Sequence, residues 1–146
     1  MHPKEDHIVT LIFTHGLNRT GMRLYKRIVE NASNFFQDLG IKEDDEGDYS
    51  LFNHCRVIFP NAPKQIVDGL DGQLMNSWFN YNNTFRSEEH DGNLDQLQQE
   101  ADQDDLQLAV ETFNELIQDE LGFVLNEDPS RVFIAGFSQG ASLVLA

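Results

Sequence analysis

A serine flanked by glycines, close to the last residue of the chain, has the surroundings that most clearly suggest chemistry. Ser138 lies in the pattern Gly-Phe-Ser-Gln-Gly, preceded by the apolar run 132–135 and followed by small residues that tolerate a helix. Such a pattern is typical of a nucleophile elbow, a sharp strand-to-helix turn that lifts a serine hydroxyl clear of a sheet. An ordinary Gly-Ser turn is the alternative, but the strand before the serine and the helix start after it favour the elbow.

Three short apolar runs predict the buried strands that would position this serine. Residues 8–13, 57–59 and 132–137 are apolar and too short for helices. Because their apolar residues are continuous rather than alternating, we expect a parallel sheet with both faces covered. Active sites in such sheets lie beyond the carboxyl ends of the strands. The His-Gly-Leu turn at 15–17 and Ser138 both lie at such ends.

Apolar residues at three- and four-residue spacing predict two amphipathic helices. The first covers residues 25–39 and should end at Gly40, and the second covers 104–121 and should end at Gly122. Residues 81–103 show neither the helical nor the strand period, so we expect a long connection there. The resulting order of elements predicts an α/β fold.

The overall charge disfavours two classes of partner. The chain has 146 residues, 40% of them hydrophobic, and a formal net charge of −15. One domain with one core is expected at this size. Strong negative charge disfavours nucleic acids and anionic membrane surfaces, because their phosphates would be repelled. Much of the charge lies in the runs 43–46 and 88–105, which are expected to be solvated loops.

Cysteine usage and hydropathy indicate a cytoplasmic protein. The lone Cys55 has no partner for an intramolecular disulfide and no metal-ligating neighbours at useful spacing. No apolar run is long enough to span a membrane, and the first residues lack the apolar core of a signal peptide. We therefore expect no transmembrane segment, no metal site and no cofactor.

Three sequence blocks together resemble a known family. These are residues 11–21, residues 59–63 with Ser-Trp-Phe at 77–79, and residues 136–141. In order and spacing they are similar to the phospholipase/carboxylesterase branch of the α/β-hydrolases, which includes the acyl-protein thioesterases. The acidic stretches at about 42–50 and 81–103 look like insertions. Two residues depart from the family pattern: Asn76 replaces a proline before Ser-Trp-Phe, and Asn80 replaces an aspartate after it.

The resemblance implies a Ser-His-Asp mechanism in which Ser138 attacks an acyl ester or thioester carbonyl. The oxyanion hole would consist of the backbone N–H groups of Leu17 and Gln139, because two pre-aimed amides stabilise the developing negative charge. Trp78 and Phe79 would line the acyl pocket as substrate-binding residues. For Trp78, an ordinary core or loop-anchoring role is an equal alternative.

The catalytic base is not evident in the sequence. In this fold the triad runs Ser, Asp, His along the chain, so both partners of Ser138 are expected beyond Ala146. His15 lies on the oxyanion turn and is expected to be structural, and the remaining histidines are expected on loops or the surface (His2, His7, His54 and His90). The resemblance therefore implies a single, incomplete α/β-hydrolase domain over residues 1–146, truncated after the nucleophile elbow and inactive alone.

Two function classes follow. The first is a serine hydrolase of acyl thioesters or carboxylic esters, acting on an acylated protein, a lysophospholipid or a small ester. The second is a non-catalytic α/β-hydrolase-like binding or interaction protein, which applies if the natural chain is this short. For the first class we expect the strand at 8–13 to lie between the other two strands. Ser138 should have a strained backbone, with Leu17 and Gln139 beside its hydroxyl.

Overall fold

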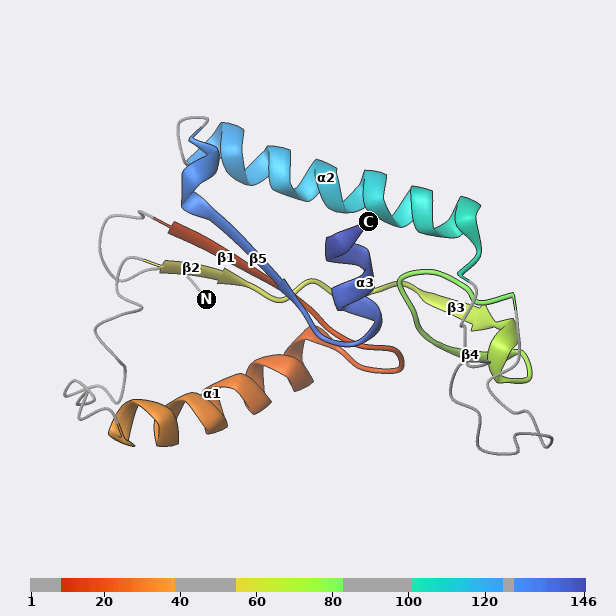
Figure 1. Cartoon of the computed structure of the whole chain (residues 1–146), viewed down its shortest axis with the longest axis horizontal. Helices are drawn as coiled ribbons and strands as arrows, with labels where there is room; N and C mark the ends of the chain where they lie inside the picture. The colour runs from red at the N-terminus through yellow and green to blue at the C-terminus, as the bar shows by residue number, and fades with distance from the viewer. Residues whose placement is uncertain (1–8, 39–54, 83–100, 125–127) are drawn as a thin grey trace.

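A parallel sheet of three strands lies at the centre of the chain. The computed structural model describes residues 9–38, 55–82, 101–124 and 128–146 (Figure 1). Its sheet consists of β1 (Val9–Thr14), β2 (Cys55–Ile58) and β5 (Val132–Gly136), in the order β2-β1-β5. Both pairings of β1 are parallel. The predicted sheet and the central position of the first strand are thus confirmed, with bounds shifted by one or two residues.

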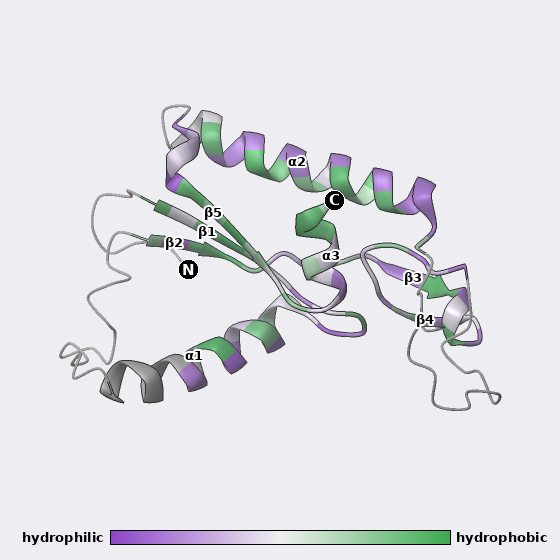
Figure 2. Ribbon diagram, in the orientation of Figure 1, coloured by the Kyte–Doolittle hydropathy of each residue, from purple (hydrophilic) through white to green (hydrophobic). Residues whose placement is uncertain are grey.

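Helices cover both faces of this sheet, as expected. Figure 1 shows α1 (Gly21–Asp38) on one side, and α2 (Gln103–Val124) and α3 (Gln139–Leu145) on the other. On the α2 and α3 side, the buried side chains of Ile12, Phe113 and Leu143 form a cluster. Figure 2 shows the apolar residues of α2 concentrated along the side that faces the sheet and α3. Burial of this stripe holds the helix in place.

The side of the sheet that faces α1 is built on aromatic contacts. Phe13 of β1 stacks on Phe59 with ring centroids 5.5 Å apart, and Tyr25 of α1 meets Phe59 edge-on at the same distance. Because successive side chains of a strand point to opposite faces, Ile12 and Phe13 serve the two layers. Alternate side chains of β1 therefore face the α1 layer and the layer of α2 and α3.

The helix ends differ from the sequence-based expectations. α1 begins at Gly21, because Thr20 Oγ1 accepts a hydrogen bond from the backbone N–H of Arg23 and so caps the first turn. Asp102 caps α2 in the same way, because its carboxylate accepts hydrogen bonds from the backbone N–H groups of Asp104 and Asp105. The predicted stop at Gly122 is wrong, since α2 continues to Val124. A glycine in the interior of a helix lowers stability by only about 1 kcal/mol relative to alanine. The packing of a long helix contributes more stabilisation than that. Gly40 lies outside the described residues.

A small antiparallel hairpin, for which the sequence analysis named no element, lies between β2 and α2. It consists of β3 (Lys64–Val67) and β4 (Gln73–Asn76), joined through the 3₁₀ helix Asp68–Leu70. A second 3₁₀ helix, Pro129–Arg131, precedes β5. The hairpin contributes to a second buried cluster formed by Val67, Met75, Phe79 and Tyr81. Four-residue strands without clear alternation leave too weak a pattern for prediction.

The two acidic segments expected as insertions are described only at their margins. The stretch at 42–50 lies outside the described residues, as do residues 83–100 of the second. At the base of the second, Tyr81 and Ala101 form an antiparallel bridge. This bridge brings the hairpin region to the start of α2.

A buried polar contact ties α2 to the sheet. Glu120 of α2 accepts a hydrogen bond from the Thr10 hydroxyl at 3.2 Å and pairs with Arg56 of β2 at 3.0 Å. The Glu120 side chain is only 6% exposed, so the carboxylate depends on these two partners.

Across the described ranges, none of the helices is both long and apolar enough to cross a membrane.

Candidate active site

Ser138 lies at a sharp turn between β5 and α3. Its backbone has φ 54° and ψ −124°, which is a strained conformation for a residue with a side chain. The chain passes directly from the last strand residue, Gly136, through Phe137 and Ser138 into the helix. The strained backbone expected for Ser138 is therefore confirmed, while its catalytic role stays a prediction.

The glycines on either side of Ser138 are required by close backbone contacts. A Cβ on Gly136 would lie 2.3 Å from the carbonyl oxygen of Gly140, and a Cβ on Gly140 would lie 2.6 Å from the carbonyl oxygen of Thr14. Neither neighbour is a flexible side chain, so a larger residue would have to move the backbone. The Thr14 hydroxyl donates to the Gly140 carbonyl at 2.9 Å and adds to this contact.

The turn that follows β1 lies against Ser138. A Cβ on Gly16 would come within 3.0 Å of the Ser138 Cβ, which brings the neighbouring Leu17 to the same edge of the sheet. Within the described ranges, no group accepts a hydrogen bond from the backbone N–H of Leu17 or of Gln139. The Leu17 turn is itself tied down, because the next residue, Asn18, donates to the Asn76 carbonyl at 2.8 Å. Two backbone donors predicted for the oxyanion hole are thus available at this edge.

His15 is held in place by both of its ring nitrogens. Nε2 accepts from the backbone N–H of Ala62 at 3.0 Å, which leaves Nδ1 to donate to the Gly16 carbonyl at 2.8 Å. The residue is almost fully buried, and burial lowers its pKa, although the hydrogen bond to Gly16 opposes this. His15 is the one histidine in the described part of the chain, and it makes no hydrogen bond to Ser138 there. Its geometry is that of a structural histidine; the other four lie outside the described residues.

The Gln139 side chain, which the sequence interpretation did not use, connects the elbow to the Ser-Trp-Phe segment. Its Nε2 donates to Ser77 Oγ at 2.9 Å and to the Phe79 carbonyl at 2.8 Å. Its Oε1 accepts from the backbone N–H of Trp78 at 3.0 Å. Gln139 is 2% exposed. The only signal in the sequence was a polar residue directly after the serine, and polarity alone did not indicate which segment it would bind.

Trp78 and Phe79 have different surroundings. The indole Nε1 of Trp78 donates to the His15 carbonyl at 2.7 Å, and the ring packs on the imidazole with centroids 5.0 Å apart. Trp78 remains half-buried and lines a cavity of about 250 Å³ between the β2–β3 connection and α2. Phe79 is 1% exposed and lies within the second buried cluster. The pocket roles assigned to both residues stay predictions.

The two asparagines that depart from the family pattern are both hydrogen bonded. Asn76 Nδ2 donates to the Ala62 carbonyl at 2.8 Å. Asn80 Oδ1 accepts from the backbone N–H of Asp68 at 2.9 Å, and its Nδ2 donates to the Asp68 carboxylate at 2.7 Å. The side chains at these two positions therefore support the segment between them.

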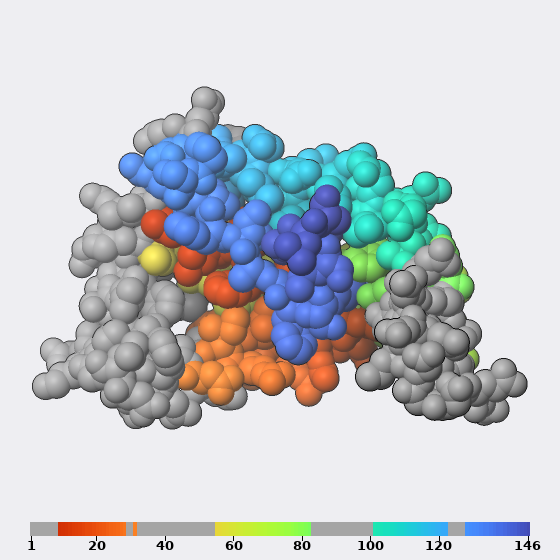
Figure 3. Space-filling model, viewed as in Figure 1, coloured from red at the N-terminus to blue at the C-terminus, as the bar shows by residue number. Residues whose placement is uncertain are grey.

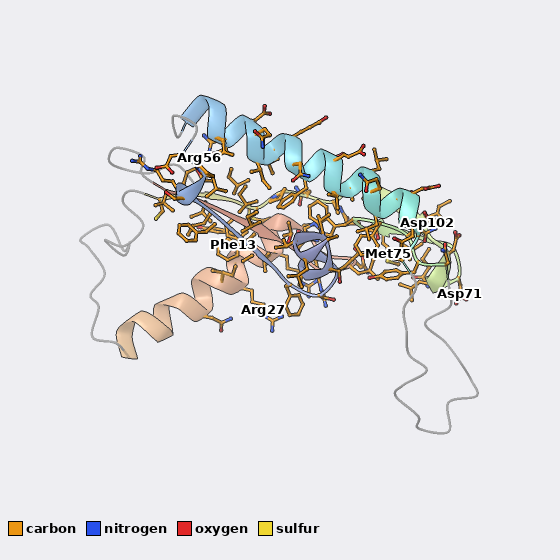
Figure 4. All side chains as sticks on the ribbon, turned by 45° about the horizontal axis from the view of Figure 1, so that its top comes forward. Phe13, Arg27, Arg56, Asp71, Met75 and Asp102 are labelled. Carbon is orange, nitrogen blue, oxygen red and sulfur yellow. The ribbon has the colours of Figure 1, made fainter. Side chains whose placement is uncertain are left out.

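Figure 4 shows the side chains of these elements crowded where β1, the hairpin and α3 meet. In the part of the chain that the structure describes, no group of three or more His, Cys, Asp or Glu side chains is placed to hold a metal ion. The described candidate site is therefore a serine at an elbow, two backbone donors, and an indole anchored beside them.

Comparisons with known proteins agree with this geometry. The chain is 28% identical over 140 residues to acyl-protein thioesterase 1 of Saccharomyces cerevisiae, covering 94% of this chain and 49% of that protein. It is 30% identical over 95 residues to acyl-protein thioesterase 1 of Kluyveromyces lactis, covering 65% and 36% respectively. The chain thus spans at most about half the length of these curated relatives.

A solved structure shares the fold. The crystal structure of Arabidopsis thaliana SOBER1 matches with a TM-score of 0.60 at 24% identity, covering 94% of this chain and 52% of that one. The family model described as Phospholipase/Carboxylesterase matches residues 44–146. With its parallel sheet, strained serine turn and two covering helix layers, the chain belongs to the phospholipase/carboxylesterase family of α/β-hydrolases.

Proposed function

We propose that the full-length protein is a serine hydrolase that cleaves acyl thioesters or carboxylic esters, with Ser138 as its nucleophile. The observation that carries the proposal is the backbone of Ser138, φ 54° and ψ −124°, at a turn packed against Gly16. Strain of this kind persists where the surrounding structure holds it, and it is common at catalytic residues. An acylated protein is the preferred substrate class, because the relatives named above are acyl-protein thioesterases.

In this mechanism Ser138 Oγ attacks the acyl carbonyl and a base takes its proton. The carbonyl oxygen becomes negative, and the backbone N–H groups of Leu17 and Gln139 stabilise it. The thiol or alcohol then leaves with a proton from the protonated base, and water hydrolyses the acyl-enzyme in the reverse sequence of steps. Trp78 lines the acyl side of the site, with Phe79 behind it. The base and its acidic partner are expected beyond Ala146, from the order Ser, Asp, His along the chain. His15 is not that base in this proposal, since both of its ring nitrogens are engaged.

No cofactor is needed for this chemistry, because the serine supplies the nucleophile and the backbone supplies the oxyanion donors. The cytoplasmic location expected from the sequence is part of the same proposal. The alternative is a non-catalytic binding protein, and the following experiment distinguishes it from a hydrolase.

The test compares Ser138→Ala with Ser142→Ala in the full-length protein. Ser142 is an exposed serine in α3, so its loss is a matched control. We expect Ser138→Ala to lower kcat for an octanoyl thioester by about 10⁴-fold or more, since triad members act as a unit. Ser142→Ala should keep its turnover, and a fluorophosphonate probe should label only proteins that retain Ser138. Near-normal turnover by Ser138→Ala would contradict the proposal, and an inert wild-type protein would favour the binding class.

A further inference from the structure

A cavity with a basic rim lies directly beside the proposed nucleophile. It has a volume of about 370 Å³, and its lining includes His15, Gly16 and Phe137. The rest of the lining consists of Leu24 and of four cationic side chains from the start of α1 and the turn before it, namely Arg19, Arg23, Lys26 and Arg27. We refer to these four residues as the basic rim. Because Gly16 lies against Ser138 and Phe137 precedes it, the cavity opens next to the reacting serine.

This concentration of positive charge contrasts with the rest of the chain. The whole sequence has 10 Lys and Arg residues against 25 Asp and Glu, yet residues 7–29 contain no Asp or Glu at all. The described ion pairs use Arg56 and Arg131, and no described carboxylate pairs with any member of the basic rim. The charged side chains that line this cavity are therefore opposite in sign to the net charge of the chain.

The basic rim is also structurally attached to the elbow. The Arg27 guanidinium lies over the Phe137 ring, 5.7 Å from its centroid, which is a cation–π distance. Figure 4 shows Arg27 between α1 and the turn that joins β5 to α3, and Figure 3 shows residues of α1 against those of the elbow region. The contact between Arg27 and Phe137 thus holds the basic rim next to the proposed nucleophile.

We propose that the basic rim binds a negatively charged phosphate or carboxylate on the leaving-group part of the substrate. The inference rests on the proposed function and specifies its substrate class: acyl esters or thioesters whose alcohol or thiol part is anionic. A fatty acyl chain would not lie here, because it would desolvate four charged groups without compensating them. Arginine forks bind carboxylate and phosphate through paired hydrogen bonds, and three of the four cations are arginines.

The apolar side of the site supports this orientation. Leu17 and Trp78 pack against the buried cluster of the hairpin, and neither of them lines the basic cavity. An acyl group bound at Ser138 therefore has an apolar direction toward Trp78 and a cationic direction toward α1. The leaving group takes the cationic direction because its charge is stabilised there.

The experiment measures kcat/KM of the full-length protein for three octanoyl thioesters that differ only in their thiol. The thiols are 2-mercaptoethanol, which is neutral, 3-mercaptopropionate, which carries a carboxylate, and 2-mercaptoethyl phosphate. We expect at least one anionic thioester to exceed the neutral one by roughly tenfold at low salt, because exposed charge pairs contribute modestly and several act together. The preference should shrink in about 1 M salt, where charges are screened beyond about 3 Å. The two anionic substrates show whether phosphate or carboxylate is preferred.

Arg23→Glu and Lys64→Glu form a matched pair of variants. Both residues are exposed and both substitutions change the net charge by the same amount, but Lys64 lies on β3 and outside the basic cavity. Arg23→Glu should reduce the anionic-to-neutral ratio at least severalfold, whereas Lys64→Glu should leave it unchanged. A wild-type ratio near one, or an equal loss in both variants, would overturn the inference while leaving the proposed function intact.

Binding measurements keep the two proposals separate. Titration calorimetry of full-length Ser138→Ala with the same three thioesters gives a Kd ratio that does not depend on turnover. Tighter binding of an anionic thioester, lost in the Ser138→Ala/Arg23→Glu double variant, supports the anion site even if no thioester is hydrolysed. Equal Kd values for the three compounds contradict it, and failure to hydrolyse any of them contradicts the proposed function instead.

Discussion

Gln139 contributes both its backbone and its side chain to the candidate site. Its backbone N–H lies directly after the strained serine, while its buried side chain holds Ser77, Trp78 and Phe79 through three contacts of 2.8 to 3.0 Å. Replacing a buried amide whose donors and acceptor are all hydrogen bonded lowers the stability of the fold, because each partner would lose its hydrogen bond. The geometry therefore couples the position of the elbow to that of the aromatic segment at the level of one residue.

His15 leads to a prediction about pH. Burial holds the pKa of His15 below its ordinary value of 6.5 in the folded protein, so the unfolded chain binds more protons between the two pKa values. The contribution of neutral His15 to stability is fully present above pH 6.5 and is lost as pH falls through the folded pKa. We expect the unfolding free energy of the full-length protein to fall more steeply from pH 7 to pH 5 in wild type than in His15→Gln, by at most about 1.4 kcal/mol per pH unit.

Urea unfolding at several pH values provides the measurement. The difference between the two proteins isolates His15, because all other titrating groups are common to both. Parallel pH profiles would show that His15 binds protons equally in the folded and unfolded states, contrary to its buried hydrogen bonds to Gly16 and Ala62.

Among the elements, β1 has the central structural role. It pairs with both other strands of the described sheet, packs against helices on both faces, and ends in the turn that lies against Ser138. α2 is attached to β1 and β2 through the Glu120 carboxylate, which contacts Thr10 of β1 and Arg56 of β2. The helix is therefore fixed by an apolar stripe and by one buried polar contact.

The second prediction compares a buried ion pair with an exposed one. Arg56→Met leaves the carboxylate of Glu120, which is 6% exposed, with the Thr10 hydroxyl alone. We expect a loss of about 2 to 4 kcal/mol, somewhat less than for fully buried pairs because Arg56 is 30% exposed. In Arg131→Met, the partners of the lost pair are 44% and 41% exposed, so the expected cost is below about 1 kcal/mol.

Chemical denaturation of both variants measures the difference. Arg56→Met combined with Glu120→Leu should recover much of the lost stability, because the double variant no longer buries an unpaired charge. If Arg56→Met and Arg131→Met cost the same, the Glu120 contact does not anchor α2 in the way that its burial indicates.

At the scale of the whole molecule, the described sheet has an apolar surface along β5. Phe133 is 56% exposed, Ile134 38% and Phe137 55%, although all three are large apolar residues. In the described sheet β5 pairs with β1 on one side and forms an edge on the other. Exposed apolar edge strands promote association between chains.

The third prediction concerns residues 1–146 expressed by themselves. We expect this chain to bind the dye ANS and to elute above its monomer mass of 16.7 kDa in size-exclusion chromatography. Phe133→Lys should reduce both effects by placing a charge on the edge strand. Leu108→Lys is the control, because Leu108 is 63% exposed but lies on α2, away from the edge. Equal improvement in both variants would mean that added charge, rather than the β5 edge, accounts for the change.

The amino-acid sequence by itself determined the parts of the fold that repeat or that sterics require. Continuous apolar runs indicated the parallel strands, three- and four-residue spacing indicated α1 and α2, and the glycines around Ser138 indicated the elbow. These features depend on local geometry, which neighbouring residues specify. The same local reasoning was wrong at Gly122, where tertiary packing outweighed the helix-breaking tendency of glycine.

Only the tertiary structure decided which distant side chains meet. The Gln139 amide binds a segment about sixty residues earlier in the chain, and the nitrogens of His15 are engaged by Gly16 and Ala62. The cations of the basic rim were counted in the sequence only as part of a strongly negative total, and their position beside Ser138 became visible only when α1 was packed against the elbow. Such contacts depend on how whole elements are placed against one another, and no local pattern of residue types specifies that placement.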